Sequence, residues 1–140
     1  MTTDNSYTKT MTVAAAPEEI FAALTDPDQV TTWWSAKSTT GSGETGGELQ
    51  ITFGTEEHPT VMRVLSAHRP GAVVWEVTSS PLIPDWKGTR PTFTMAATED
   101  GCRLDFVHHG LVPSLECFDL CNVDWGRFLV RLAAHAEQRG

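Results

Sequence analysis

The sequence predicts a protein of the α+β class, in which a long C-terminal helix covers one face of an antiparallel sheet. Apolar and polar residues alternate through most of the middle of the chain, which is typical of strands with one buried face. The last part of the chain instead repeats apolar residues at helical spacing. Two short segments near the start carry helix-start signals. The expected order is therefore one strand, two short helices, about five more strands and one long helix.

The first three elements are predicted to follow one another closely. Residues 7–13, YTKTMTV, alternate in the period-two pattern of a strand. In APEEIFAALTD, Pro17 stands at a first helical position, and the two glutamates after it face the positive end of the helix dipole. Asp26 and Pro27 repeat this signal as N-cap and first helical residue. We expect a second short helix from Pro27 to about Trp34, meeting the first at a sharp bend.

The segment SAKSTTGSGETGG, residues 35–47, is rich in Gly, Ser and Thr and predicts a mobile loop. Its length suggests the rim of a cavity. The final helix is expected to begin near Asn122 or slightly earlier. Between loop and helix, the expected strands cover residues 48–53, 60–67, 72–77, 92–98 and 102–109, and the last two form a hairpin through the tight turn EDG.

Composition limits the classes of partner. A chain of 140 residues fits one domain, 1–140, with a core of useful size. The net charge is −8 and the ten Lys and Arg residues are scattered, so nucleic acid and anionic membranes are poor partners. No secretory signal or transmembrane segment is present, and three cysteines without CxxC spacing suit free thiols in a reducing compartment. We therefore expect a cytoplasmic protein that does not insert into membranes.

Four motifs in this order resemble a known family. They are APEEIFAALTDPDQVTTWW, DWKGTRPTFTM, EDGCRLDFVHHGL and DWGRFLVRL, and together they span nearly the whole chain. The order is similar to the helix-grip fold of the START-like (SRPBCC) superfamily, in its branch of homologues of the activator of the heat-shock-protein-90 ATPase. The resemblance implies a curved sheet around the long helix. It also implies a cavity between them, bounded by the two short helices and nearby loops.

The strand alternation and the helical spacing indicate which side chains face this cavity. They are mainly large and apolar, so they form either the walls of a ligand site or a solid core, and the sequence does not distinguish the two. The inward-facing set is Phe53, Trp75, Phe93, Met95 and Phe106 from the strands, with Trp125 and Leu129 from the final helix.

Trp33 and Trp34 are neighbours on the second short helix, about 100° apart around its axis. They cannot both cover the same spot on one core. One interpretation is that Trp34 faces the core and the cavity while Trp33 lies at the cavity rim, both touching a ligand. The alternative is that both indoles only fill space in core and rim.

His108 shares the register of Leu104 and Phe106 and is predicted to point inward, with His109 outward. It could orient a polar ligand group or act as an acid or base, or it could be a structural histidine that bonds the start of the terminal segment. Cys117 and Cys121 could face the same side of a helix beside these histidines, but no zinc-ligand spacing supports a metal site, and buried or redox-neutral thiols are expected. The chain has no GxSxG motif and no Walker loop, so no cofactor is expected.

Three functions remain open. The first is a binding or carrier protein for a hydrophobic or amphipathic small molecule, favoured by the implied cavity, its aromatic walls and the lack of catalytic motifs. The second, suggested by the family, is a chaperone-associated interaction module, with a possible chaperone or homodimer contact. The third is an enzyme of cyclase or hydrolase type that uses His108 in the same cavity, although the sequence offers no catalytic partner.

Overall fold

The computed structural model describes residues 6–34, 36–52, 59–68, 71–79, 87–109 and 118–139; within these ranges, the side chains of residues 6, 7, 118–125 and 139 are not described. The described elements follow the expected order: one strand, two short helices, a run of strands and a long final helix. In chain order they are β1 (Ser6–Val13), α1 (Pro17–Thr25), α2 (Pro27–Trp34), β2 (Ser38–Gly41), β3 (Glu48–Thr52), β4 (Thr60–His68), β5 (Ala72–Ser79), β6 (Arg90–Thr98), β7 (Gly101–His109) and α3 (Phe118–Arg139).

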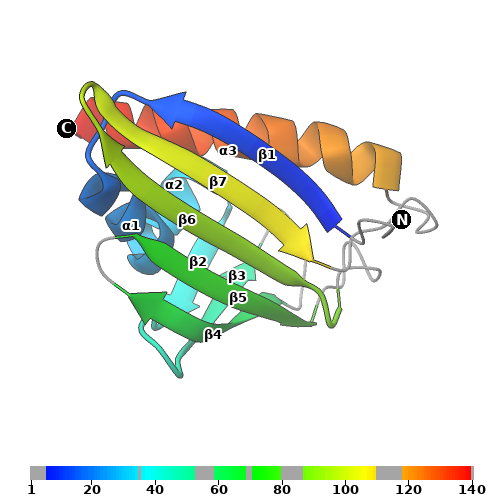
Figure 1. The fold of residues 1–140 in the computed structure, drawn as a ribbon. Coiled ribbons are helices and arrows are strands. Elements are labelled where there is room, and N and C mark those ends of the chain that lie inside the picture. The colour runs from blue at the N-terminus through cyan, green and yellow to red at the C-terminus, as the bar shows by residue number, and fades with distance from the viewer. Residues whose placement is uncertain are drawn as a thin grey trace.

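The described strands form one antiparallel sheet in the order β1-β7-β6-β5-β4-β3-β2. Because α1 and α2 separate the first two strands, β1 pairs with the last strand, and β2 forms the opposite edge. Figure 1 shows the sheet curving in front of the three helices, with α3 running along β1 and the two short helices gathered at one end of α3. α1 contacts β5, β6 and α3, and α2 contacts β2 and α3.

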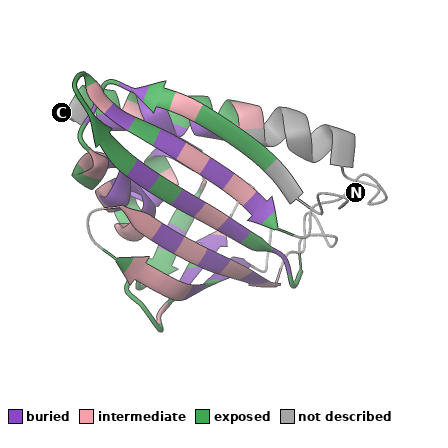
Figure 2. Cartoon of the chain, viewed as in Figure 1, coloured by how far each residue is buried: buried purple, intermediate pink, exposed green. Residues whose placement is uncertain are grey.

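One face of the sheet is buried under the helices. Along β7, Cys102, Leu104, Phe106 and His108 are buried, whereas the residues between them are half-buried or exposed. This alternation runs along the neighbouring strands as well (Figure 2). The helices contribute the other side of the core, and the two sides together bury a contiguous apolar cluster.

The predicted fold class is confirmed: the chain is an α+β protein with a helix-grip arrangement. The strand count differs, since the described part of the chain forms seven strands where about six were expected in total. The additional strand, β2, lies within the segment predicted to be a mobile loop. It pairs with β3, and Thr39 buries its side chain and hydrogen-bonds Thr31 of α2, the two Oγ1 atoms lying 2.8 Å apart. A short edge strand rich in Thr and Gly has no apolar alternation, which is why its sequence predicts a loop.

Among the described residues, no helix is both long and apolar enough to cross a membrane.

Candidate functional site

A row of aromatic rings lies on the buried face of the sheet. Trp75 of β5 meets Phe93 of β6 edge to face, with ring centroids 5.0 Å apart, and Phe93 meets Phe106 of β7 at 4.9 Å. These three side chains come together because the strands pair in register: Phe93 lies opposite Phe106, and Val73, two residues before Trp75 and on the same face, lies opposite Phe93. The predicted inward positions of all three residues are confirmed.

The second short helix extends this row toward α3. Trp34 stacks on Trp75 with centroids 6.1 Å apart and planes 11° apart, and it meets Phe128 of α3 edge to face at 5.4 Å. Trp33 also stacks on Trp34, with ring centroids 5.0 Å apart and planes 9° apart. Trp34 therefore bridges the sheet and α3, as expected for a residue facing the core.

The expectation that Trp33 lies at a cavity rim is wrong, because both indoles are only 2% exposed. α2 is eight residues long and is packed against α1, β2 and α3, so positions 100° apart on it are both covered. The Trp33 indole N–H donates a hydrogen bond of 2.8 Å to the backbone carbonyl of Ala23 in α1. This bond fixes the bend between the two helices.

Trp75 differs from Trp33 in the hydrogen bonding of its indole N–H. Its side chain is fully buried, and its indole N–H has no hydrogen-bond acceptor among the residues that the structure describes. Buried indole N–H groups usually find an acceptor, because leaving one unpaired costs free energy. Nothing in the sequence distinguishes this N–H from that of Trp33.

His108 is buried at the end of the aromatic row, as predicted, with its ring centroid 6.4 Å from that of Phe106. Its Nε2 lies 2.6 Å from Oγ1 of Thr89, which is also buried. Burial, and secondarily the charge of the neighbouring His109, lower the pKa of His108 to about 3. The imidazole is therefore neutral at physiological pH.

Sequence reasoning missed Thr89 as the partner of His108. It precedes β6 in a segment that reads as a Pro-rich connection, and only the pairing of Val77 N–H with the Thr89 carbonyl aligns it with the buried face. The expected bond from His108 to the start of the terminal segment falls on residues outside the described part of the chain.

The other predicted site residues are only partly described. Met95 and Leu129 are buried on the sheet side and the helix side of the core, at 5% and 1% exposure. Phe53 lies outside the described residues, and so does the side chain of Trp125. The structure thus brings eight of the predicted residues together. Seven belong to one buried cluster, namely Trp33, Trp34, Trp75, Phe93, Met95, Phe106 and Leu129, and His108 lies at its end.

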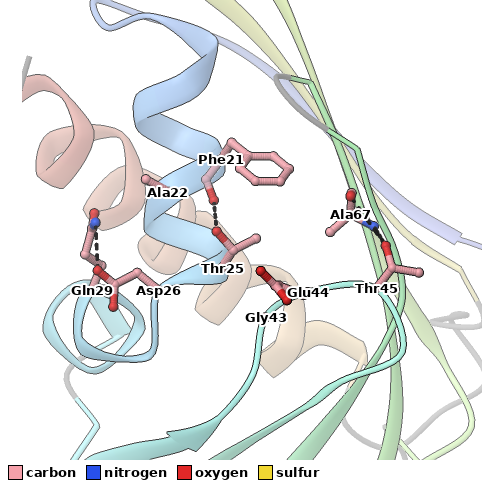
Figure 3. Close-up of a pocket in the computed structure, with 9 residues that line it drawn as sticks. All are labelled: Phe21, Ala22, Thr25, Asp26, Gln29, Gly43, Glu44, Thr45 and Ala67. Atoms are coloured by element: carbon pink, nitrogen blue, oxygen red, sulfur yellow. Dashed lines mark hydrogen bonds between the residues drawn. The ribbon is translucent and has the colours of Figure 1, made fainter.

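A groove of about 670 Å³ lies elsewhere, where α1 and α2 meet the turn after β2 and the strand β4 (Figure 3). None of the eight predicted ligand-binding residues whose side chains the structure describes lines it. Its turn belongs to the segment 35–47 that was expected to form a cavity rim. Its apolar lining is Phe21, Ala22 and Ala67, and its polar lining is Thr25, Asp26, Gln29, Glu44 and Thr45 beside Gly43.

The turn beside this groove is held by a side-chain hydrogen bond to β4 and by a backbone contact with α1. The Ala67 N–H donates to Thr45 Oγ1 at 2.8 Å, which ties the turn to β4. On the other side, the backbone of Gly43 lies directly against that of Thr25, and a Cβ at residue 43 would collide with the Thr25 carbonyl. The turn that borders the groove is therefore attached to β4 on one side and packed against α1 on the other.

The structure describes one of the three cysteines with its side chain. Cys102 is a free thiol on the buried face of β7, and burial raises its pKa. Cys117 and the side chain of Cys121 fall outside the described residues. Within the described residues, no three His, Cys, Asp or Glu side chains gather as metal ligands would.

Solved structures of similar fold come from several bacteria. Aha1 from Colwellia psychrerythraea, solved in solution as a dimer, is 23% identical, with 94% of this chain and 96% of that chain covered and a TM-score of 0.79. A protein from Mesorhizobium loti is 17% identical, with 96% and 98% covered and a TM-score of 0.80. DynU16, from the dynemicin biosynthetic locus, is 18% identical and aligns with 96% of this chain but only 48% of its own, with a TM-score of 0.74.

At such identities the solved structures show the fold alone, and a comparison with curated proteins finds no match. The family described as Activator of Hsp90 ATPase homolog 1-like protein, however, matches residues 14–137. This match confirms the resemblance seen in the sequence motifs. Because it covers most of the chain, the chain belongs to the family of activator of Hsp90 ATPase homolog 1-like proteins.

Proposed function

We propose that this protein binds a hydrophobic or amphipathic small molecule between the buried face of its sheet and α3. The aromatic row from Trp34 through Trp75 and Phe93 to Phe106 carries the proposal. Four large rings in contact give a ligand wide apolar surfaces at little cost in side-chain entropy. Phe128 and Leu129 supply apolar surface from the side of α3.

The proposed site includes the remaining predicted residues. Phe53 and Trp125 would extend the wall, and Met95, whose flexible thioether adapts to ligands of different shape, would complete it. Trp33 would act indirectly, because it stacks behind Trp34 and fixes its position. His108 would limit the pocket at one end as a neutral polar group.

A binding screen tests the proposal. Purified protein is titrated with uncharged aromatic and aliphatic molecules while tryptophan fluorescence and the melting temperature are followed. A ligand that binds the folded state raises the melting temperature, and the rise grows with the logarithm of its concentration relative to its dissociation constant. We expect a saturable fluorescence change with one molecule per chain. A library that leaves both signals unchanged at saturating concentrations would contradict the proposal.

The groove beside α1 is the competing location, and a groove-filling variant separates the two. Ala22 lines the groove and lies on α1, so Ala22→Phe places a ring in it without touching the aromatic row. Binding in the interior survives this substitution with unchanged affinity. Loss of binding in Ala22→Phe would move the ligand to the groove.

A second candidate function is a chaperone-associated interaction module, favoured by the family match and by the dimer formed by the Colwellia protein. Its test is the ATP turnover of a purified chaperone of the heat-shock-protein-90 class with and without this protein. Sedimentation of the protein alone examines a homodimer contact. Unchanged ATP turnover and a monomer at all concentrations would remove this candidate.

The enzyme reading receives no support from His108. A general base works best with a pKa near the operating pH, and a pKa of about 3 makes this imidazole a poor proton acceptor. The polar group described beside it is the hydroxyl of Thr89, 2.6 Å from Nε2. We place the binding function in the cytoplasm, where the described free thiol of Cys102 stays reduced, and cell fractionation tests this.

A further inference from the structure

We propose that the indole N–H of Trp75 donates a hydrogen bond to an uncharged oxygen acceptor, such as a ketone or amide carbonyl, on the molecule bound in the interior. This inference rests on the proposed binding function and names the chemical class of its ligand. It assigns Trp75 a specific role beyond forming an apolar wall.

The first observation is the unpaired donor itself. Trp75 is completely buried on β5, and its Nε1 has no acceptor within the described part of the chain. Trp33 on α2 is also buried, but its indole N–H donates a hydrogen bond of 2.8 Å to the Ala23 carbonyl, as buried indole N–H groups usually do. A buried donor without an acceptor costs free energy in the unliganded protein, and a ligand oxygen that pairs with it recovers that cost.

The second observation is the position of this donor. Trp75 stands in the middle of the aromatic row, between Trp34 on one side and Phe93 on the other. A ligand that lies along the row reaches the donor with its central part while its ends cover aromatic surface. The ligand is therefore an apolar body with an acceptor, not a pure hydrocarbon.

The interior around Trp75 favours an uncharged ligand acceptor, because its described buried side chains carry no positive charge. The buried polar side chains among the described residues are Gln29, Thr39, Thr60, Thr89 and His108, and none of them is Lys or Arg. His108 is neutral because burial lowers its pKa to about 3. A carboxylate in this interior would lose its hydration and gain only one hydrogen bond, which does not offset the cost.

The test uses three fluorescent probes that share one ring system. Prodan, a dimethylaminonaphthalene with a propionyl group, carries an uncharged ketone. Dimethylaminonaphthalene lacks the ketone, and dimethylaminonaphthalene carboxylate replaces it with an anion. The dissociation constant of each is measured with the wild-type protein and with Trp75→Phe, which removes the donor and keeps an aromatic ring.

The readout is the ratio of the affinities for the ketone and the ketone-free ring. We expect Trp75→Phe to lower this ratio by about tenfold, as the loss of one buried hydrogen bond predicts. The carboxylate is expected to bind more weakly than both uncharged probes. Trp33→Phe is the matched control: it also removes one indole N–H, and we expect it to change both affinities by the same factor.

The outcomes separate this inference from the proposed function. If the ketone-free ring binds but the ratio is the same in wild type and Trp75→Phe, the N–H makes no hydrogen bond to the ligand, and the inference is overturned while the binding function stands. If no probe binds the wild-type protein, both fail. Should Trp75→Phe not fold, the NMR signal of the Trp75 N–H in the wild type replaces it: a downfield shift with Prodan alone supports the inference, and no shift overturns it.

Discussion

Trp33 and Trp34 are equally buried, but different contacts hold them. Trp33 stacks on its neighbour and bonds Ala23 of α1, whereas Trp34 lies between Trp75 of the sheet and Phe128 of α3. A sequence pattern predicts that neighbouring helical residues face different directions, but it does not show that other elements cover both directions. The location of an indole therefore depends on the packing of α1 and α3 around α2, which the local sequence does not contain.

Both indoles are expected to be essential for stability. Trp33→Ala and Trp34→Ala should each lower the free energy of unfolding by about 3–5 kcal/mol, because each removes a large buried side chain and leaves a cavity. Urea denaturation followed by circular dichroism measures this. A loss of less than about 1 kcal/mol for Trp33→Ala would show that Trp33 is exposed in solution, contrary to its burial here.

His108 makes stability depend on pH. Its pKa is about 3 in the folded protein and near 6.5 when unfolded, so below pH 6.5 the unfolded chain binds a proton that the folded chain does not. The stabilisation is complete above pH 6.5 and is lost as pH falls toward 3. Between pH 7 and pH 5 this amounts to about 2 kcal/mol.

Urea unfolding at these two pH values measures the effect, with His108→Asn and His68→Asn compared. His108→Asn should remove most of this pH dependence. His68 is exposed at the end of β4, so His68→Asn should retain it. An equal pH dependence in wild type and His108→Asn would mean that His108 titrates normally.

The helices and strands that could be predicted from the sequence are those whose position is determined by local residue patterns. The bend between α1 and α2 and the alternation of β5, β6 and β7 follow from proline, N-cap and period-two signals. β2 and the position of Thr89 do not, because each depends on pairing with a strand elsewhere in the chain. The groove likewise depends on how the turn after β2 meets α1.

Two glycines provide a matched test of the contact between α1 and the turn after β2. Gly43→Ala should lower the free energy of unfolding by about 1–3 kcal/mol, because its Cβ collides with the Thr25 backbone and displaces the turn from α1. Gly126 lies in α3 with open space around its Cα, so Gly126→Ala should stabilise the protein by about 0.5–1 kcal/mol. Melting temperatures of the two variants measure the difference. A Gly43→Ala protein as stable as wild type would show that the turn does not pack on α1.

At the scale of the whole molecule, the fold was predictable and the ligand was not. Fold class follows from the order of elements and from four motifs that match one family over residues 14–137. The proposed binding chemistry depends on which buried polar atoms remain unpaired among the described residues, and the sequence around Trp75 does not reveal that its N–H is one of them. A proposal about the ligand therefore depends on contacts between helices and strands, and the composition and periodicity of the sequence do not reveal these contacts.

Residues 1–140 are proposed to fold as a single domain, and unfolding tests it. The apolar cluster takes residues from the three described helices and from every described strand except β2, so unfolding any of these elements exposes part of the same core. Tryptophan fluorescence reports on α2 and β5 through Trp33, Trp34 and Trp75, with further contributions from Trp86 and Trp125, whereas far-ultraviolet circular dichroism reports on all elements. We expect the two signals to give one transition with the same midpoint in urea, in the wild type and in Trp75→Phe alike. A fluorescence transition at lower urea would show that the surroundings of the tryptophans unfold before the rest of the chain, and the description as one cooperative domain would then be withdrawn.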